Sequence, residues 1–338
     1  MKKWIQGMFL SLMITGAGCH GGEESVSTND PKILEKQPFL TLTDSIDRFP
    51  KEENLFLRRG LLLSQNNAHS LATADYKKAW KLAPDENNAL LLASSLFIEG
   101  KQDEVVKFLN DLVIRYPANQ EFRRRLSEAY VQQGKTKEAL EQYNNILKND
   151  SLNFQAWYEK AAISADNKDT ATAISCLEKA YSLQPLQLYG LALANLYAET
   201  KNSKTLAFCD ELIARDSAAE SGDAFFIRGI YFSNLNEPKK ALEQFEACIR
   251  RDWKFTDAYI EKGIILFEEK NIDEALNTFM LASKVSNTNP DAYYWQGRCF
   301  ESIGKLEAAG DAYKRAVMLD REFTEARKAL ERLHKSKN

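Results

Sequence analysis

The sequence is short of the residues that build metal sites and disulfide frameworks. Its 338 residues include three histidines, His20, His69 and His334, far apart along the chain, and five cysteines without a Cys-x-x-Cys pair. This spacing predicts no metal-ligand cluster. Gly-rich phosphate loops and the Gly-x-Ser-x-Gly and His-Glu-x-x-His motifs are also missing. We therefore expect that the protein is not an enzyme and that it binds neither a cofactor nor a metal.

The chain also lacks an excess of positive charge. It has 45 basic and 48 acidic residues, and removal of residues 1–18 would leave 43 against 48, a net charge of −5. Nucleic-acid binding requires a basic face that displaces counterions, so we expect no nucleic-acid partner. The single basic cluster is Arg123-Arg124-Arg125. Its side chains would point in different directions on a helix, which is typical of a solvated face.

What the sequence does have is a period of 34 residues. A small or β-branched residue recurs at 33 or 34 residues throughout the chain, at Ala72, Val105, Ala139, Ala173, Ala207, Ala241, Ala275 and Ala309. A second series of mostly small residues keeps the same period, at Gly60, Ala93, Ser127, Ala161, Asn195, Gly229, Gly263 and Gly297. Such a period is typical of stacked helical units. Small residues at fixed positions allow two helix backbones to approach closely.

Bulky residues and turn signals divide each unit into two helices. Aromatic residues lie four positions before some of the glycines and four after the alanines, a spacing that places them on one helical face. Turn signals fall between the helices, at Gly100-Lys101, Gly134-Lys135, Asn236-Glu237-Pro238 and Gly304-Lys305. Pro84, Pro117 and Pro185 end their units, because proline cannot continue a helix.

These residues resemble the tetratricopeptide repeat family. The match is carried by Phe225, Gly229, Phe232, Ala241, Phe245 and Cys248 and by the equivalent residues of the two following units. The resemblance implies an all-α fold, a right-handed α-solenoid of about eight antiparallel helix pairs over residues 53–323. The pairs would begin near Glu53, Glu86, Gln120, Phe154, Leu188, Gly222, Thr256 and Pro290. We expect a capping helix in residues 39–52 and a C-terminal capping helix and tail in residues 324–338.

The first residues have the layout of a secretory signal. Met1-Lys2-Lys3 precedes an apolar run that ends at small residues before Cys19. This start resembles the bacterial lipoprotein signal, which implies a signal peptide in residues 1–18 and lipid on Cys19. Residues 19–38 would be a flexible linker. An ordinary secretory signal with a chance cysteine is the alternative. The expected location is the bacterial cell envelope as an outer-membrane lipoprotein, on either its periplasmic or its surface face.

In the resembled family the first helices of the pairs line a groove that binds partners. The resemblance places there Arg124, Tyr158, Tyr189, Asp223, Phe226, Ile230, Asp257, Ile260, Ile264, Phe267, Asp291, Tyr294 and Arg298. Asp223, Asp257 and Asp291 repeat at the period. They could form an acidic rail for a basic partner, although we favour stabilisation of each helix by its first-turn acid. The apolar groove residues favour a contact surface for a peptide.

Together these features predict a lipid-anchored scaffold that binds protein or peptide partners at the cell envelope. The alternative is an envelope protein that binds carbohydrate or another small ligand, with Tyr158, Tyr189, Phe226 and Tyr294 as stacking platforms. Apart from Cys19, the cysteines are expected to be buried free thiols, because rigid neighbouring helices rarely bring two Cβ atoms within disulfide distance. They are Cys176, Cys209, Cys248 and Cys299.

Overall fold

The computed structural model describes residues 30–216 and 221–335, which divide into two compact units at Leu183 and Gln184. The described residues are helical throughout, without a strand. The predicted all-α solenoid of helix pairs is confirmed. The predicted signal peptide and Cys19 lie outside the described residues. No helix within the described ranges is both long enough and apolar enough to cross a membrane.

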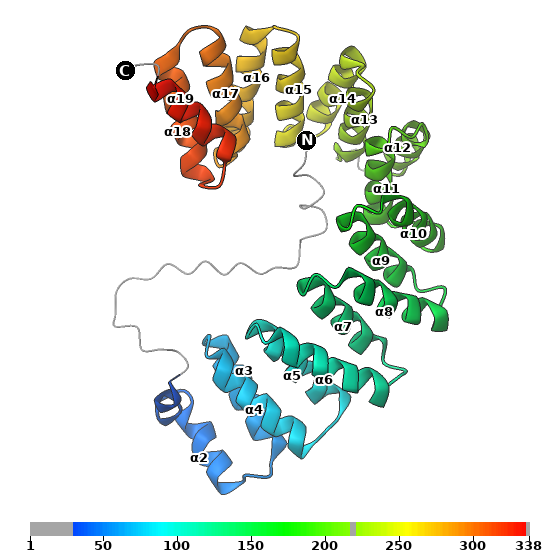
Figure 1. Ribbon diagram of the computed structural model, residues 1–338, viewed down its shortest axis with the longest axis vertical. Helices are drawn as coiled ribbons and strands as arrows, with labels where there is room; N and C mark the ends of the chain where they lie inside the picture. The colour runs from blue at the N-terminus through cyan, green and yellow to red at the C-terminus, as the bar shows by residue number, and fades with distance from the viewer. Residues whose placement is uncertain (1–29, 217–220, 336–338) are drawn as a thin grey trace. The chain divides into compact units, whose positions relative to one another are not determined.

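The first unit consists of two leading elements and four antiparallel helix pairs (Figure 1). The leading elements are the 3₁₀ helix η1 (Pro31–Glu35) and the short helix α2 (Leu40–Arg48). The pairs are α3 (Glu53–Gln65) with α4 (His69–Leu82), α5 (Glu86–Ile98) with α6 (Gln102–Arg115), α7 (Gln120–Gln132) with α8 (Thr136–Asn149), and α9 (Phe154–Asp166) with α10 (Thr170–Leu183).

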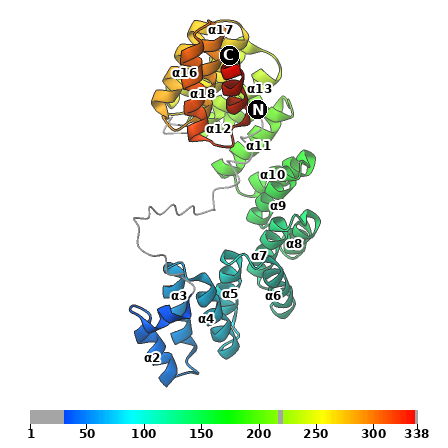
Figure 2. The same cartoon turned by 60° about the vertical axis from the view of Figure 1, so that its left-hand side comes forward.

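The second unit contains four further pairs and one last helix (Figure 2). The pairs are α11 (Gln187–Glu199) with α12 (Lys204–Arg215), α13 (Asp223–Asn234) with α14 (Pro238–Arg251), α15 (Thr256–Glu268) with α16 (Ile272–Val285), and α17 (Pro290–Ser302) with α18 (Leu306–Leu319). The last helix, α19 (Thr324–Lys335), packs on α18.

Helix starts and turns follow from local chemistry. The side chains of Asp85, Asn153 and Asn289 accept hydrogen bonds from the first-turn amides of α5, α9 and α17, which satisfies donors that have no partner within the helix. The turn inside each of the eight pairs contains one residue with positive φ. Three of these residues are glycine and five are asparagine or lysine, at Asn67, Gly100, Gly134, Lys168, Lys201, Asn236, Lys270 and Gly304. The left-handed conformation ends the first helix and reverses the chain.

Close approach of the two helices explains the repeated glycine. A Cβ atom added to Gly297 would lie 2.5 Å from Cε1 of Tyr313, and one added to Gly263 would lie 2.5 Å from Cε1 of Phe279. Both aromatic rings are fully buried. The missing side chain in the first helix therefore makes room for the ring in the second.

A short segment before the helix pairs packs on the core of the first unit. Ile33 and Leu34, in a segment expected to be flexible linker, pack against the apolar core of the first pairs. A buried ion pair fixes α2 beside them. The Arg59 guanidinium donates two hydrogen bonds of 2.8 Å to the Asp75 carboxylate and a third, of 3.1 Å, to Thr43 Oγ1 in α2. A flexible linker was expected over residues 19–38, but its part Pro31–Glu35 is a 3₁₀ helix that packs on the core.

Candidate functional site

Three of the residues expected in an exposed groove lie in the core. Phe226 is only 1% exposed, and its ring stacks on Phe255 with centroids 5.0 Å apart and contacts Phe245 at 5.5 Å. Tyr189 and Ile260 are 5% and 7% exposed. The expectation that these three side chains are exposed is wrong, because rings and helices of adjoining pairs cover them. Tyr189 lies on α11, which packs against both α12 and α13.

Four other apolar residues of the predicted groove are only partly buried in the second unit. They are Ile230, Ile264, Phe267 and Tyr294. Arg298 lies over three aromatic rings, at 5.2 Å from the centroid of Phe267, 5.4 Å from that of Trp295 and 6.0 Å from that of Tyr294. One guanidinium nitrogen donates a hydrogen bond of 3.3 Å to Tyr294 Oη. The rings thus hold the cation in a fixed position at the edge of the apolar residues.

A hollow of about 480 Å³ opens beside Arg298, between α17 and α19. It is lined by Tyr294, Arg298, Glu301, Ser302, Glu325, Lys328, Ala329 and Arg332. Its α19 residues were not among the predicted site residues, because α19 was interpreted only as a cap. The 34-residue period could have identified these residues, because Lys328 and Arg332 follow Tyr294 and Arg298 by 34 positions. Helix α19 therefore stands where the first helix of a ninth pair would stand.

Arg124, by contrast, already forms ion pairs with carboxylates of the first unit. Its guanidinium pairs with the Glu159 carboxylate of α9 and donates a hydrogen bond of 2.9 Å to Glu121. Although burial alone would lower the pKa of Arg124, these carboxylates raise it, so the side chain is a firmly held cation. Tyr158, on the same helix as Glu159, is half-buried. This part of the predicted site is a charge network internal to the protein.

The three repeated aspartates lie in the first turns of α13, α15 and α17. Asp223 accepts a hydrogen bond of 2.6 Å from the Ser221 hydroxyl. Burial raises the pKa of Asp257, and the negative charge of Asp291 raises it further. The effect of Asp291 on the pKa of Asp257 is that of a repulsion between the two carboxylates. Their place in the first helical turn offsets this repulsion, because the amide groups there favour negative charge.

The first unit exposes apolar side chains that the sequence interpretation did not select. Leu61 on α3, Ile98 on α5 and Val131 on α7 are 54%, 58% and 43% exposed. Helices α3, α5 and α7 are the first helices of successive pairs and run along one side of this unit, with α4, α6 and α8 along the other (Figure 1). The sequence could have identified these residues from their repeat positions, which lie in the second half of each first helix. The predicted groove residues instead came from the third and later pairs, beginning with Arg124.

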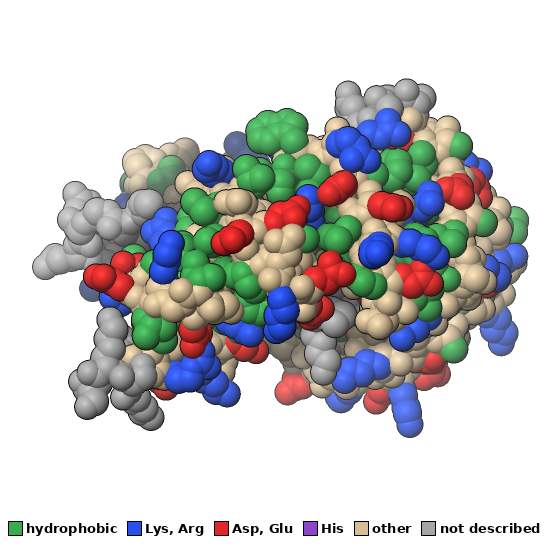
Figure 3. Space-filling model, turned by 90° about the horizontal axis from the view of Figure 1, so that it is seen from above, with side chains coloured by type: hydrophobic (Ala, Val, Ile, Leu, Met, Phe, Trp, Pro, Cys, Tyr) green, Lys and Arg blue, Asp and Glu red, His purple; other side chains and the backbone are tan. Residues whose placement is uncertain are grey.

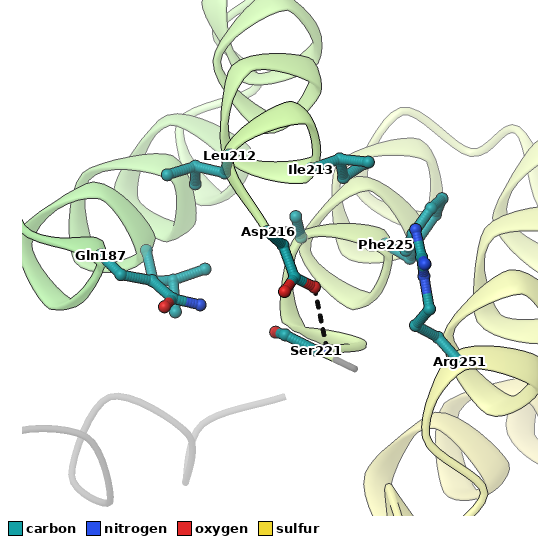
Figure 4. A pocket seen from close by; sticks show the side chains of 9 residues that line it. Gln187, Leu212, Ile213, Asp216, Ser221, Phe225 and Arg251 are labelled. Atoms are coloured by element: carbon teal, nitrogen blue, oxygen red, sulfur yellow. Dashed lines mark hydrogen bonds between the residues drawn. The ribbon is translucent and has the colours of Figure 1, made fainter. Parts of the chain in front are cut away.

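A second hollow lies where α12 leads into α13 (Figure 4). The Asp216 carboxylate accepts a hydrogen bond of 3.0 Å from the Ser221 amide, and Arg251 lies over the Phe225 ring at 5.5 Å. The space is only about 10 Å³, room for one water molecule. It is too small to accept a partner's side chain.

Charge is mixed over the surface shown in Figure 3, where apolar side chains alternate with both cationic and anionic ones. The four cysteines within the described residues, Cys176, Cys209, Cys248 and Cys299, are buried and free, as expected. Burial raises the pKa of the Cys209, Cys248 and Cys299 thiols to about 12. At neutral pH these thiols are protonated, and a neutral thiol is a poor nucleophile. They act as small apolar core residues.

Models of known families match three stretches of the chain. Those of the tetratricopeptide repeat match residues 124–187 and 290–323. A model of the bacterial transcriptional activator domain matches residues 87–150, the region of α5 to α8. The Hsp70-Hsp90 organizing protein of Triticum aestivum is 24% identical over 244 residues, which cover 69% of this chain and 41% of that protein. The chain thus spans less than half the length of this relative.

Two solved structures share the fold. A tetratricopeptide repeat protein from Parabacteroides merdae has a TM-score of 0.50 at 13% identity, covering 83% of this chain and 98% of that one. PilW, described as a widely conserved type IV pilus biogenesis factor, has a TM-score of 0.50 at 16% identity, covering 62% of this chain and 98% of that one. At sequence identities this low, the similarity supports a shared fold and nothing further.

Proposed function

The chain is a tetratricopeptide repeat protein, and from this premise we propose that it is a lipid-anchored scaffold that holds protein partners at the bacterial cell envelope. The observation that carries the proposal is the exposure of apolar side chains on the first helices of successive pairs. Leu61, Ile98 and Val131 project from α3, α5 and α7 among polar neighbours. Apolar side chains gathered on one side of a molecule are typical of contact sites.

A protein segment suits this surface better than a small molecule. The exposed residues are spread over helices that follow one another along the unit, so an occupant that contacts all of them must be extended or helical. The name of the Triticum aestivum relative, an Hsp70-Hsp90 organizing protein, fits the same general role. The partners of this chain are not implied by that name.

The stacking platforms needed for carbohydrate binding are only partly available. Two of the four aromatic residues considered for it, Tyr189 and Phe226, are buried beneath neighbouring helices. A sugar ring stacks on an exposed aromatic face, which these two side chains do not offer. The geometry therefore favours the protein scaffold.

The membrane anchor rests on the residues before the helical units. The basic start, the apolar run and the small residues before Cys19 together support lipidation at that cysteine. Cys19→Ser removes the acceptor sulfur. The variant should leave the membrane fraction and stay soluble after cell breakage, while the unchanged protein is extracted only by detergent. Equal membrane retention of both forms would remove the anchor from the proposal.

Photo-crosslinking tests the contact surface. A crosslinking amino acid placed at Ile98 should capture a partner in intact cells. The matched control is Ile114, an isoleucine of the second helix in the same pair that is more exposed, at 78%. If the first helices bind the partner, position 98 gives discrete crosslinked products and position 114 does not. Equal products at both positions, or none at position 98, would contradict the proposed surface.

A further inference from the structure

The hollow between α17 and α19 contains more cationic side chains than the protein itself neutralises. Arg298, Lys328 and Arg332 line it together with Glu301 and Glu325. Arg332 is neutralised, because one of its guanidinium nitrogens lies 2.7 Å from each oxygen of Glu301. Glu301 also accepts a hydrogen bond of 2.8 Å from the Tyr313 hydroxyl. The Glu301 carboxylate thus uses the charge of Arg332 and leaves that of the other two cations.

The other two cations have no such partner. Within residues 30–216 and 221–335, neither Arg298 nor Lys328 forms an ion pair with a carboxylate. The remaining acid, Glu325, lies in the first turn of α19, where the helix amides already stabilise its charge. The hollow therefore retains two cations with unused capacity to bind an anion.

Arg298 is also held in place before any ligand arrives. Its guanidinium packs against Phe267, Trp295 and Tyr294, and among the described residues its side chain donates a hydrogen bond only to the neutral Tyr294 hydroxyl. Contacts with aromatic faces restrict the side chain without using up its capacity to bind a carboxylate. A planar guanidinium fixed in this way loses little freedom when a carboxylate binds to it.

We propose that this hollow binds the side chain of an aspartate or glutamate within a partner's peptide segment. The proposal rests on the protein-scaffold function proposed above and names the chemistry of one part of the partner. The carboxylate lies against Arg298 and Lys328. An apolar residue next to it in the peptide lies on the half-buried Phe267 and Ile264 of α15. A volume of about 480 Å³ is enough for an acidic side chain and the backbone around it.

Selection from a random peptide library tests the proposal on the full chain. In the first library each peptide is followed by a fixed linker, so it has no free C-terminus. We expect aspartate or glutamate beside an apolar residue to be enriched. Arg298→Gln and Lys328→Gln should each abolish that enrichment. For the best peptide, bound through a fluorescent label, Arg298→Gln should weaken the affinity about 10- to 100-fold.

Arg315 provides a matched control. It is also an arginine over an aromatic ring, at 5.7 Å from the centroid of Tyr293, but it does not line the hollow. Arg315→Gln should keep both the enrichment and the affinity. Arg298→Lys, which retains the charge and loses the planar fork, should fall between Arg298→Gln and the unchanged protein. Circular dichroism of every variant checks that helix content is retained.

Several outcomes would overturn the proposal. One is a selection without acidic residues, or with acidic residues that persist in Arg298→Gln and Lys328→Gln. Another is enrichment only in a second library with free C-termini, which would assign the hollow to a chain-terminal carboxylate. Enrichment of phosphorylated peptides alone would assign it to phosphate. If crosslinking from Ile98 continues while acidic enrichment fails, only this inference falls; if both fail, the scaffold proposal falls with it.

Discussion

Replacing Gly297 by alanine should destabilise the α17–α18 pair, although alanine is the better helix former. The added Cβ would lie 2.5 Å from Cε1, 2.6 Å from Cδ1 and 3.0 Å from Cζ of Tyr313. The ring has no open space to move into, because Tyr313 is fully buried and its hydroxyl is hydrogen-bonded to Glu301. The helices must therefore separate or the ring must leave its preferred rotamer.

The two effects can be set against each other. Alanine in place of glycine inside a helix stabilises it by about 1 kcal/mol. Overpacking of a dense core costs about 1–3 kcal/mol, and the confinement of Tyr313 favours the upper end. We expect a net loss of about 2 kcal/mol in the free energy of unfolding of this pair.

Gly310 supplies the control within the same pair. It lies inside α18, and a Cβ added there would meet nothing within 4 Å. Gly310→Ala should therefore stabilise the pair by about 0.5–1 kcal/mol, the helix-propensity effect alone. The same chemical change is expected to act with opposite signs at two positions thirteen residues apart.

Hydrogen exchange measured by mass spectrometry can locate the effect. A loss of 2 kcal/mol should speed exchange of the slowest amides in α17 and α18 about 30-fold, since 1.36 kcal/mol corresponds to a factor of ten. Gly310→Ala should slow the same amides. The reasoning is refuted if Gly297→Ala exchanges no faster than the unchanged protein, or if both variants shift in the same direction.

Three other perturbations test the core. Phe226→Ala should lower the free energy of unfolding in urea by about 3–5 kcal/mol, as expected for a buried ring; an unchanged stability with loss of partner binding would return Phe226 to the contact surface. Asp75→Ala should cost about 3–5 kcal/mol because it leaves the Arg59 guanidinium buried without its carboxylate, and an unchanged urea midpoint would mean that water replaces the carboxylate. With a pKa of about 12 in place of 9.0, the Cys209 and Cys299 thiols should be almost entirely protonated at pH 9. They should react with a thiol reagent several hundred times more slowly than in the unfolded chain, whereas fast native labelling would show that they are accessible.

Much of the fold could be predicted because its determinants lie close together in sequence. Gly263 and Gly297 each face an aromatic residue 16 positions later, and this spacing repeats with the period. The predicted unit starts at Glu86, Gln120 and Thr256 coincide with the first residues of α5, α7 and α15. Such spacings fix which residues meet inside a pair.

Exposure was harder to predict because it depends on the neighbouring pair. Phe226 occupies a repeat position that is partly exposed in other units, yet Phe255, which precedes the next first helix, covers its ring. The repeat position alone cannot say how large the covering side chain is. The hollow at α19 was missed for a related reason. The segment of α19 was expected only to cap the apolar core. The charged residues on its exposed side were not compared with those at the equivalent repeat positions of α17.

The helices contact chiefly the helices next to them along the chain, such as α16 with α17 and α17 with α18. The apolar face of each pair is thus covered by helices that are close to it in sequence. Each pair can form as soon as the next helix has been delivered, so folding proceeds step by step and involves little search. For a polypeptide that emerges from the ribosome one end first, this order leaves a single growing end to protect from aggregation at any moment.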